Sequence, residues 1–229
     1  MFIKLTRYWF ILLSVCCSSA LGQNETSKWY FGNGAGLDFM TNPPTVITTN
    51  SLTEPAGCAS AADANGNLLF YTNGNVIYDQ TNATMANGSG LSGNNAASQS
   101  ALIVKQPNSS SLYYVFTLGQ ANFCSFDYSI VDMSLASGNG SVTVKNVLLN
   151  SKEDEKLSAA RHCNGTDFWI IAHSTAGNSY CAYLLSAAGL NTIAVVSSIG
   201  YSLYGFNGGL YGYMKVSPNG KKLAAGYWM

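Results

Sequence analysis

The chain has 229 residues, of which 10% are charged, and its 11 Lys and Arg balance its 11 Asp and Glu. A chain this close to neutral, with no basic stripe, is not typical of proteins that bind nucleic acid or anionic membranes, so we expect neither partner. Its 23 Gly, together with many Asn, Ser and Thr, are typical of exported β-rich proteins with short strands and polar turns.

Residues 1–22 have the pattern of a secretory signal peptide. Lys4 and Arg7 form a basic start, and the apolar run at 8–17 is too short to span a bilayer. Ala20-Leu21-Gly22 then supplies the small residues of a cleavage site. We therefore expect export through the Sec pathway and a secreted, extracellular or outer-membrane-surface location, with no membrane span after cleavage.

The mature chain is expected to begin near Gln23, with residues 23–28 as a short polar lead and residues 29–229 as the folded part. A lipoprotein signal ending at Cys16 is the less favoured alternative, because Val15 stands where a small residue is wanted.

The folded part opens with short strands. Trp29-Tyr30-Phe31 begins it, and the segments 37–39 and 46–49 are further strand candidates. Pro43-Pro44 lies between these two segments and separates them, because proline interrupts regular hydrogen bonding.

The stretch Asp63–Gly74 predicts a hairpin that recurs along the chain. Asn65-Gly66 tolerates the positive φ of a tight turn, and Leu68–Thr72 is a short apolar and aromatic run that favours a strand. An EF-hand calcium loop is set aside, because the stretch has Gly at its fourth position instead of its sixth, and Gly74 where that loop needs Glu. Similar stretches follow at Ser109–Gly119, Asn164–Ser174 and Ser217–Gly226.

Each recurrence belongs to a unit with a strand of small or apolar residues, a turn, an aromatic strand and one or two further strands. The predicted strands are 58–63, 68–72 and 76–79 in the first unit; 101–105, 112–118, 128–133 and 142–149 in the second; 156–162, 168–173, 180–185 and 193–199 in the third; and 213–216 in the fourth. The low-complexity stretch 81–100 is expected to be an irregular loop in place of the first unit's outer strand. Residues 152–160 are the only candidate for a turn or two of helix.

The turns recur after 43, 56 and 55 residues. Four strands per unit at a repeat of about 40–50 residues predict an all-β, β-propeller-like fold whose blades are four-stranded antiparallel sheets. Because propellers close with about 4–8 blades, the roughly three blades and one hairpin of this sequence predict an incomplete ring. We accordingly expect the chain to be the N-terminal piece of a longer protein, whose continuation would close the ring.

Six segments, in this order, resemble one bacterial family: WYFGNGAGLDF, GCASAADANGNLLFYTNG, SLYYVF, YSIVDMSL, EKLSAARHCNGTDFWIIAH and GYMKVSPNGKKLA. The family is the N-terminal propeller region of large exported Bacteroidota proteins, described as gliding-motility-associated or PKD-domain proteins. The resemblance extends from Trp29 to Ala225. It implies a propeller, PKD-like modules after it and a C-terminal sorting domain recognised by the type IX secretion system, and it implies no catalytic motif.

Four cysteines remain after signal cleavage: Cys58, Cys124, Cys163 and Cys181. Their spacing matches no metal site, so we expect no metal and no cofactor. An exported protein can form disulfides, and four cysteines allow three pairings. Cys58 and Cys163 are expected at opposite ends of parallel inner strands, whereas Cys124 and Cys181 hold similar places in adjacent units and form the favoured pair.

Four polar residues are weak candidates for a binding site at the mouth of the central channel: Lys105, Arg161, His162 and His173. For the two histidines, satisfied polar positions at blade ends are favoured over a catalytic or metal role. No Ser-His-Asp arrangement can be argued, so we assign no catalytic residue. The loops 119–126 and 174–179 are the other expected location for a site.

Two further groups of residues have a structural interpretation. Glu153-Asp154-Glu155 is expected to be a solvated charge cluster in a loop. Six aromatic residues on the strands are interpreted as packing between blades rather than as a carbohydrate platform: Tyr113, Tyr114, Phe116, Phe168, Trp169 and Tyr180.

The predicted function is a non-catalytic binding, interaction or adhesion module at the cell surface, with an unidentified protein or glycan as its ligand. The alternative is an exported propeller enzyme, a hydrolase or lyase that acts on polysaccharide. That alternative requires convergent acids or a His/Tyr/Arg cluster at the channel mouth, and the sequence offers scattered candidates.

Overall fold

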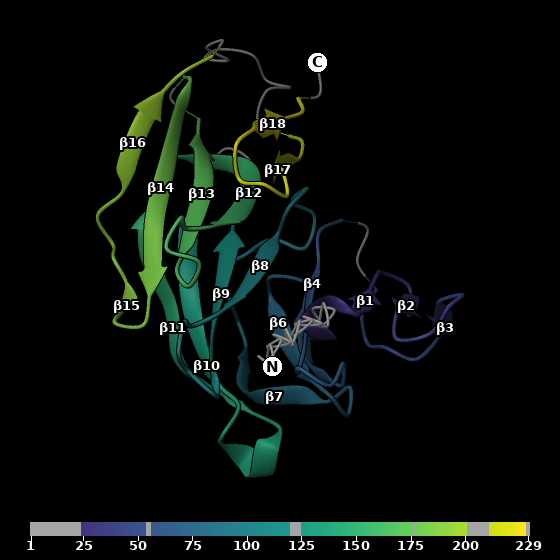
Figure 1. Cartoon of the computed structure of the whole chain (residues 1–229). Helices are drawn as coiled ribbons and strands as arrows, with labels where there is room; N and C mark the ends of the chain where they lie inside the picture. Colours follow the sequence, from purple (N-terminus) through teal and green to yellow (C-terminus); the bar gives the residue numbers. More distant parts are fainter. Residues whose placement is uncertain (1–23, 54–55, 120–124, 176, 201–210, 228–229) are drawn as a thin grey trace, which may run out of the picture.

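The computed structural model describes residues 24–53, 56–119, 125–175, 177–200 and 211–227, so the predicted signal peptide at 1–22 lies outside the described residues. The described part is an all-β structure, as predicted, with two short 3₁₀ turns, η1 (Asn24–Thr26) and η2 (Ala136–Gly138). Figure 1 shows the strands and their order. No helix among these residues is long and apolar enough to cross a membrane.

The strands form four sheets. The first has the order β1 (Lys28–Tyr30), β2 (Gly36–Asp38), β3 (Thr45–Ile47). The second has the order β4 (Ala59–Ala62), β5 (Leu68–Thr72), β6 (Val76–Asp79), β7 (Thr84–Ser89), β11 (Ser141–Asn150), β10 (Phe126–Asp132), β9 (Leu112–Leu118), β8 (Ala101–Lys105). The third has the order β12 (Glu153–Arg161), β13 (Phe168–Ser174), β14 (Ser179–Ser186), β15 (Gly189–Leu190), and β16 (Val195–Ser198) also pairs with β14. The fourth is the hairpin of β17 (Met214–Val216) and β18 (Leu223–Ala225).

The eight-stranded sheet consists of two antiparallel meanders, β4–β7 and β8–β11, which are joined through their outer strands. β7 and β11 pair in parallel at Ala86 and Ser141. The side-chain amide of Asn87 adds a hydrogen bond of 2.8 Å to the carbonyl oxygen of Val142. Because of this join, the strands do not divide clearly into separate four-stranded sheets, which is where the architecture departs from the predicted blades.

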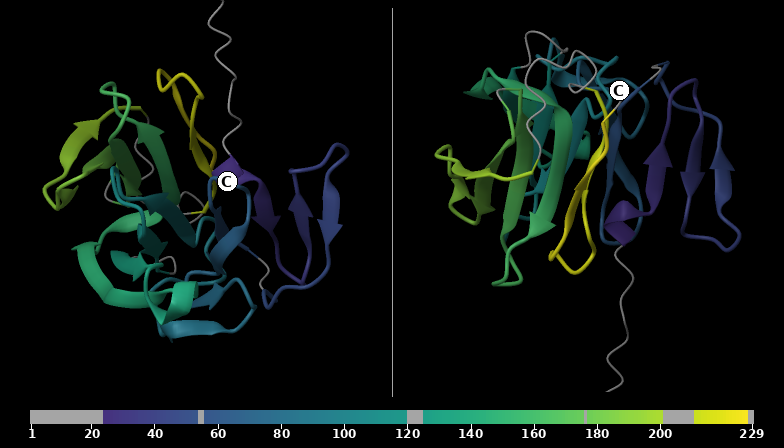
Figure 2. Two further views of the ribbon diagram at one scale, coloured as in Figure 1. Left: turned by 60° about the horizontal axis from the view of Figure 1, so that its bottom comes forward. Right: turned by 90° about the horizontal axis from the view of Figure 1, so that it is seen from above.

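The first strand of each group contacts the first strand of the next group. β1 contacts β4, β4 contacts β8, β8 contacts β12, and β12 contacts β17. Figure 2 shows the result: β1–β3, the two meanders, β12–β16 and β17–β18 follow one another around a common centre.

Two apolar cores fill the spaces between neighbouring groups of strands. In the first, between the two meanders, the rings of Phe70 and Tyr113 meet with centroids 5.5 Å apart. In the second, between β8–β11 and β12–β14, Phe126 meets Tyr183 at 5.6 Å. Burial of such rings supplies most of the favourable free energy of folding. Tyr113, Tyr114 and Phe116 are buried in these cores, as expected for packing residues, whereas Phe168 is half-buried and lines a hollow.

The hairpin at 63–74 forms as predicted. Asp63 Oδ1 accepts hydrogen bonds from the backbone N–H groups of Asn65 (2.9 Å) and Asn67 (2.8 Å). Gly66 has a φ of +82°, a conformation that only glycine adopts without strain. The following strand, β5, begins and ends at the predicted residues.

Two predicted segments have a different structure. Residues 84–89, expected to be irregular, form β7, because Met85 is buried in the first core and both edges of the strand find a partner. Residues 152–160, the candidate for helix, mostly belong to β12, because β13 pairs along this strand as far as Arg161.

Candidate functional site

One hollow in the structure brings together two of the four predicted binding residues. It has a volume of about 480 Å³ and is lined by residues of η1, β4, β8 and β12. Ala62, Lys105 and Arg161 are the last residues of β4, β8 and β12, and all three line it. We call this site the Lys105–Arg161 hollow.

The two cations of the hollow rest on aromatic rings and carry no paired carboxylate. Lys105 Nζ lies 5.7 Å from the ring centroid of Tyr113, and the Arg161 guanidinium carbon lies 5.2 Å from that of Phe168. Arg161 also donates to the carbonyl oxygen of Gly165 at 2.8 Å. Within the described residues, neither cation forms a salt bridge. Their positive charge therefore remains available to a ligand.

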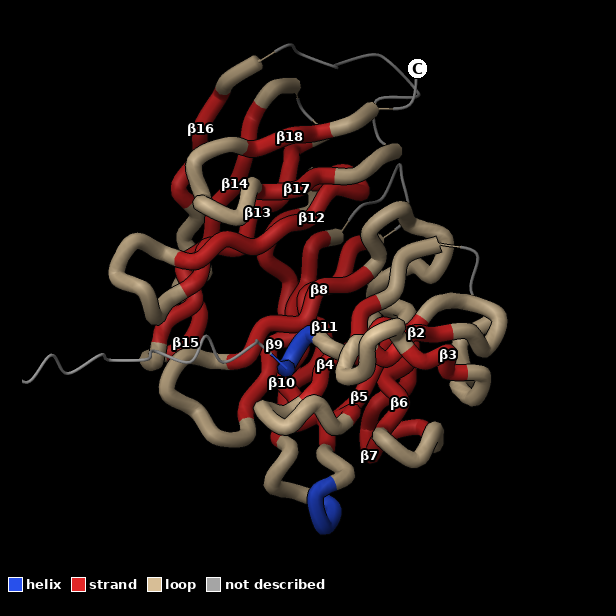
Figure 3. The backbone as a smooth tube through the Cα atoms, turned by 45° about the vertical axis from the view of Figure 1, so that its right-hand side comes forward, coloured by secondary structure: helices blue, strands red, loops and turns tan. Residues whose placement is uncertain are grey.

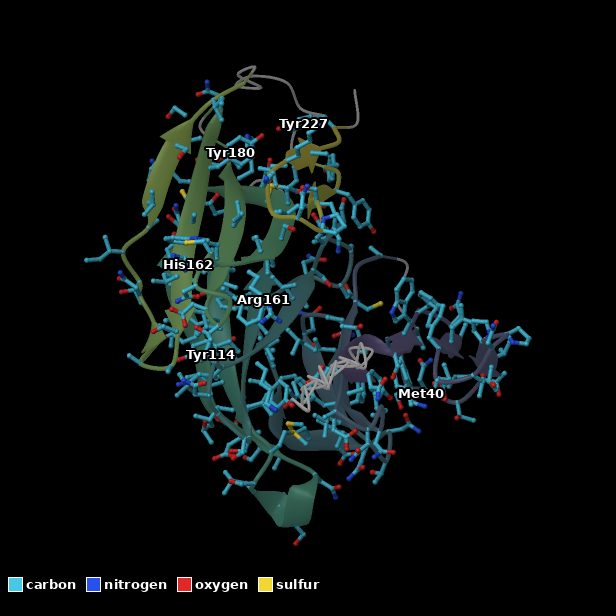
Figure 4. All side chains as sticks on the ribbon, viewed as in Figure 1. Met40, Tyr114, Arg161, His162, Tyr180 and Tyr227 are labelled. Carbon is cyan, nitrogen blue, oxygen red and sulfur yellow. The ribbon has the colours of Figure 1, made fainter. Side chains whose placement is uncertain are left out.

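His162 follows Arg161 directly and does not line the Lys105–Arg161 hollow, but the two residues line a second hollow together. This second hollow has a volume of about 410 Å³ and lies between the end of β12 and the turn of the β17–β18 hairpin. His162 Nδ1 accepts a hydrogen bond of 3.1 Å from the backbone N–H of Asn164, and the His162 ring lies 5.6 Å from that of Trp169. Figure 4 labels Arg161 and His162 side by side in the middle of the molecule.

His173 lies at the opposite end of the β12–β13 ladder. At one end of this ladder Arg161 pairs with Phe168, and at the other Glu153 pairs with Ser174, next to His173. Arg161 therefore lies between two hollows, one shared with Lys105 and the other with His162, whereas His173 is buried at the other end of the ladder.

His173 belongs to a buried charge cluster that the sequence interpretation missed. The cluster consists of Glu153, Asp154, Glu155, Lys156 and His173, whose exposed fractions are 0%, 1%, 1%, 0% and 2%. The expectation of a solvated loop for residues 153–155 is therefore wrong. Asp154 Oδ2 is the centre of the cluster, since it accepts from Lys156 Nζ at 2.9 Å and lies 2.6 Å from His173 Nδ1.

A bulge at the start of β12 explains why consecutive charged residues are all buried. Between the pairs Glu153–Ser174 and Leu157–Ala172, three residues of β12 face one residue of β13. A bulge breaks the alternation of side chains between the two faces of a strand. Asp154 Oδ1 stabilises it by accepting a hydrogen bond of 3.0 Å from the backbone N–H of Lys156.

Neighbouring segments supply the remaining partners of the cluster. Glu155 Oε2 accepts from the backbone N–H and the hydroxyl of Ser98, at 2.7 and 3.0 Å. Lys156 Nζ lies 4.3 Å from the ring centroid of Tyr227, and the rings of Tyr180 and Tyr227 pack edge-on against His173. Figure 4 labels these two tyrosines near the C-terminus, away from Arg161. The cluster therefore cross-links β12, β13 and β14 with Ser98 and Tyr227.

Glu153 is the least satisfied member of the cluster. Asn150 donates a hydrogen bond of 2.7 Å to its Oε1, whereas the described residues offer no hydrogen-bond partner to its Oε2 or to Nε2 of His173. Burial raises the pKa of Glu153 to about 7. Burial, together with the neighbouring Glu153, raises the pKa of the Cys181 thiol to about 12, so this thiol is protonated near neutral pH.

Three of the four cysteines considered for a disulfide lie among the described residues. Cys58, Cys163 and Cys181 carry free thiols. Cys124 lies outside the described residues, so the pairing of Cys124 with Cys181 stays a prediction. In the part of the chain that the structure describes, no group of three or more His, Cys, Asp or Glu has an arrangement that could hold a metal ion.

The only sequence signal for the buried charge cluster is its position. Residues 153–155 lead directly into the predicted strand 156–162 without Gly, Pro or another turn residue between them. The binding candidates Lys105 and Arg161, by contrast, lie at or next to the ends of the predicted strands 101–105 and 156–162, the first strands of successive units.

Comparison with known proteins adds no relative: no protein-family model, no curated protein and no solved structure matches the chain.

Proposed function

We propose that the chain is an exported, non-catalytic binding module, and that its ligand site is the Lys105–Arg161 hollow. The observation that carries the proposal is the convergence of two cations, from the ends of neighbouring first strands, on one hollow where neither has a salt bridge among the described residues. Pockets of about 300–1,000 Å³ are the usual size for small ligands, and the hollow lies within this range.

The ligand chemistry that fits this hollow is an acidic glycan. Carboxylate or sulfate groups on a sugar would form charge-assisted hydrogen bonds with Lys105 and Arg161. The ring of Phe168, which also lines the hollow, offers an apolar surface to a sugar face. Binding at such a site needs no catalytic group.

The architecture that we propose around this site is a β-propeller with an incomplete ring. Two features support it: consecutive antiparallel meanders, and first strands that lie next to each other around a common centre. We further propose that the chain is the propeller region of a larger, cell-surface Bacteroidota protein of the gliding-motility-associated or PKD-domain type, exported by type IX secretion. The six ordered segments that resemble this family support this proposal.

A polysaccharide-active hydrolase is the less favoured function. Glycoside hydrolysis generally uses two carboxyl groups about 5–10 Å apart. Among the described residues that line the Lys105–Arg161 hollow, Glu25 is the only acid. The acids of the buried charge cluster are enclosed and hydrogen-bonded within the protein, as structural cross-links are.

Calorimetric titration with an acidic oligosaccharide, oligogalacturonate, and with a neutral oligosaccharide of the same length tests the binding proposal. We expect binding of the acidic ligand only, and a loss of at least about tenfold in affinity for Arg161→Ala and for Lys105→Ala, because each removes a charge-assisted hydrogen bond. Lys152→Ala, which removes an exposed cation at the other end of β12, away from this hollow, is the matched control. Equal binding of both oligosaccharides, or equal loss in the control, contradicts the proposed site.

Two further measurements address catalysis and location. Incubation of the protein with the acidic oligosaccharide, followed by product analysis, should show no cleavage; turnover that Arg161→Ala abolishes would refute the non-catalytic proposal. N-terminal sequencing of the exported protein should give Gln23 as the first residue, and a retained residue 1 would contradict signal cleavage.

A further inference from the structure

The outer strand of the third sheet, β16, has one hydrogen-bonded neighbour. It pairs with β14 from Ser179–Ser198 to Ala182–Val195, and no strand among the described residues pairs with its other edge. Figures 1 and 3 both show β16 at the margin of the molecule. An open edge of this kind presents backbone N–H and C=O groups that can pair with another strand.

The side chains of β16 and its flanks are apolar and exposed. Ile193, Val195, Val196 and Ile199 have exposed fractions of 79%, 57%, 60% and 68%. Val195 and Val196 are consecutive, so they point to opposite faces of the strand, and neither face is covered. We call residues 193–199 the β16 edge.

The outer strands of the first two meanders are covered in a way that the β16 edge is not. β7 and β11 cover each other's outer edges through the parallel pair Ala86–Ser141 and a 2.8 Å hydrogen bond from Lys145 Nζ to the carbonyl oxygen of Ser89. This chain therefore already pairs outer strand with outer strand, and β16 is the corresponding strand that has no such partner among the described residues.

Two other open edges in the described structure, those of β3 and β18, lie next to residues that usually block pairing. Pro43 and Pro44 precede β3, and Lys221 and Lys222 precede β18. Proline and lysine at an edge oppose association of strands. The β16 edge has neither, and no Asp, Glu, Lys, Arg or His occurs from Ser174 to Met214.

The lack of charge around β16 bears on the identity of its partner. Two identical surfaces meeting about a two-fold axis bring like charges together, and such contacts cost binding free energy. The segment 174–214 has no charge to repel its own copy, and the chain without residues 1–22 has a formal net charge of only −2, because cleavage removes Lys4 and Arg7. An antiparallel pair of identical strands satisfies a two-fold axis, because each edge is then both donor and acceptor to the other.

We propose that the β16 edge is a self-association surface, on which a second copy of this chain pairs antiparallel through its own β16. The sheet β12–β13–β14–β16 then continues into the same sheet of the partner. β16 has only four residues, so the interface is smaller than the roughly 1,600 Å² of a standard stable complex, and the dimer is weak. This inference is independent of the ligand proposed for the Lys105–Arg161 hollow.

Sedimentation equilibrium of the mature chain, which begins at Gln23, from about 1 µM to about 1 mM, measures this association. We expect the mass to rise from monomer to dimer and to stop there. Val196→Lys places like charges at the two-fold contact, and it should weaken the dimer at least about tenfold. Val46→Lys, at a similarly exposed valine (66%) on the open strand β3, is the matched control and should leave the dimer unchanged.

A mixture of Val196→Lys and Val196→Glu chains should recover the dimer, since opposite charges then meet at the contact. Hydrogen exchange of the unchanged protein provides a second readout, in which the β16 amides slow with concentration and the β3 amides do not. A monomer at every concentration, assembly beyond dimer without a plateau, or equal weakening by Val46→Lys would each overturn the proposal.

Discussion

Glu153 should make the protein less stable as the pH rises from 5 to 8. Burial raises the pKa of this carboxyl to about 7, from a value of 4.5 in the unfolded chain. Between these two values the folded state holds a proton that the unfolded state has lost, so stability falls as the pH increases. A difference of this size corresponds to a loss of about 2–3 kcal/mol between pH 5 and pH 8.

Glu153→Gln should remove this dependence. A glutamine keeps the oxygen that accepts the 2.7 Å hydrogen bond from Asn150, and it needs no ionisation. We expect the variant to be close in stability to the unchanged protein at pH 5, and more stable by about 2–3 kcal/mol at pH 8. Urea denaturation at pH 5, 6, 7 and 8 measures both proteins.

Other shifted carboxyl groups do not interfere in this range. Hydrogen bonds from Lys28 and Ser134 lower the pKa values of Asp38 and Asp132, respectively. Their contribution is present above the unfolded pKa, near 4, and is lost only below it. If the two proteins have the same slope of stability against pH, or if Glu153→Gln is less stable at pH 8, the reasoning about Glu153 is wrong.

Three further changes test the packing and the turn, each by urea denaturation at neutral pH. Asp154→Ala should cost about 3–5 kcal/mol, because it removes the carboxylate that accepts hydrogen bonds at the centre of the buried cluster, and a cost under about 1 kcal/mol would refute the buried cross-link. Phe116→Ala, at a fully buried ring, should cost about 3–5 kcal/mol, whereas an exposed-site control, Leu148→Ala, should cost far less. Gly66→Ala should cost about 1–2 kcal/mol, because alanine is strained at a φ of +82° and its Cβ would lie 2.5 Å from Met40 Sδ; an unchanged midpoint would contradict the turn geometry.

Local chemistry in the sequence was sufficient for most strands. β5, β6, β8 and β9 begin and end at the predicted residues, because each is a short apolar or aromatic run bounded by turn residues. Lys105 and Arg161 were two of the four residues predicted at the channel mouth, and the structure brings both to one hollow.

Tertiary structure decided the features that depend on partners distant in sequence. The polar segment 84–89 is a strand only because β6 and β11 pair with its two edges. The open edge of β16 is apparent only once the pairing of all other outer strands is known.

The buried charge cluster shows the difference most directly. The sequence by itself determined that three charged residues, 153–155, precede the predicted strand 156–162, and a solvated loop was the interpretation of these three. Only the tertiary structure decided that they are buried. A bulge in β12 turns consecutive side chains inward, and His173, Ser98 and Tyr227, which are distant in sequence, contact the buried charged residues. Secondary-structure propensity predicts neither a bulge nor contacts between residues distant in sequence. Both decide whether a charged side chain can be buried.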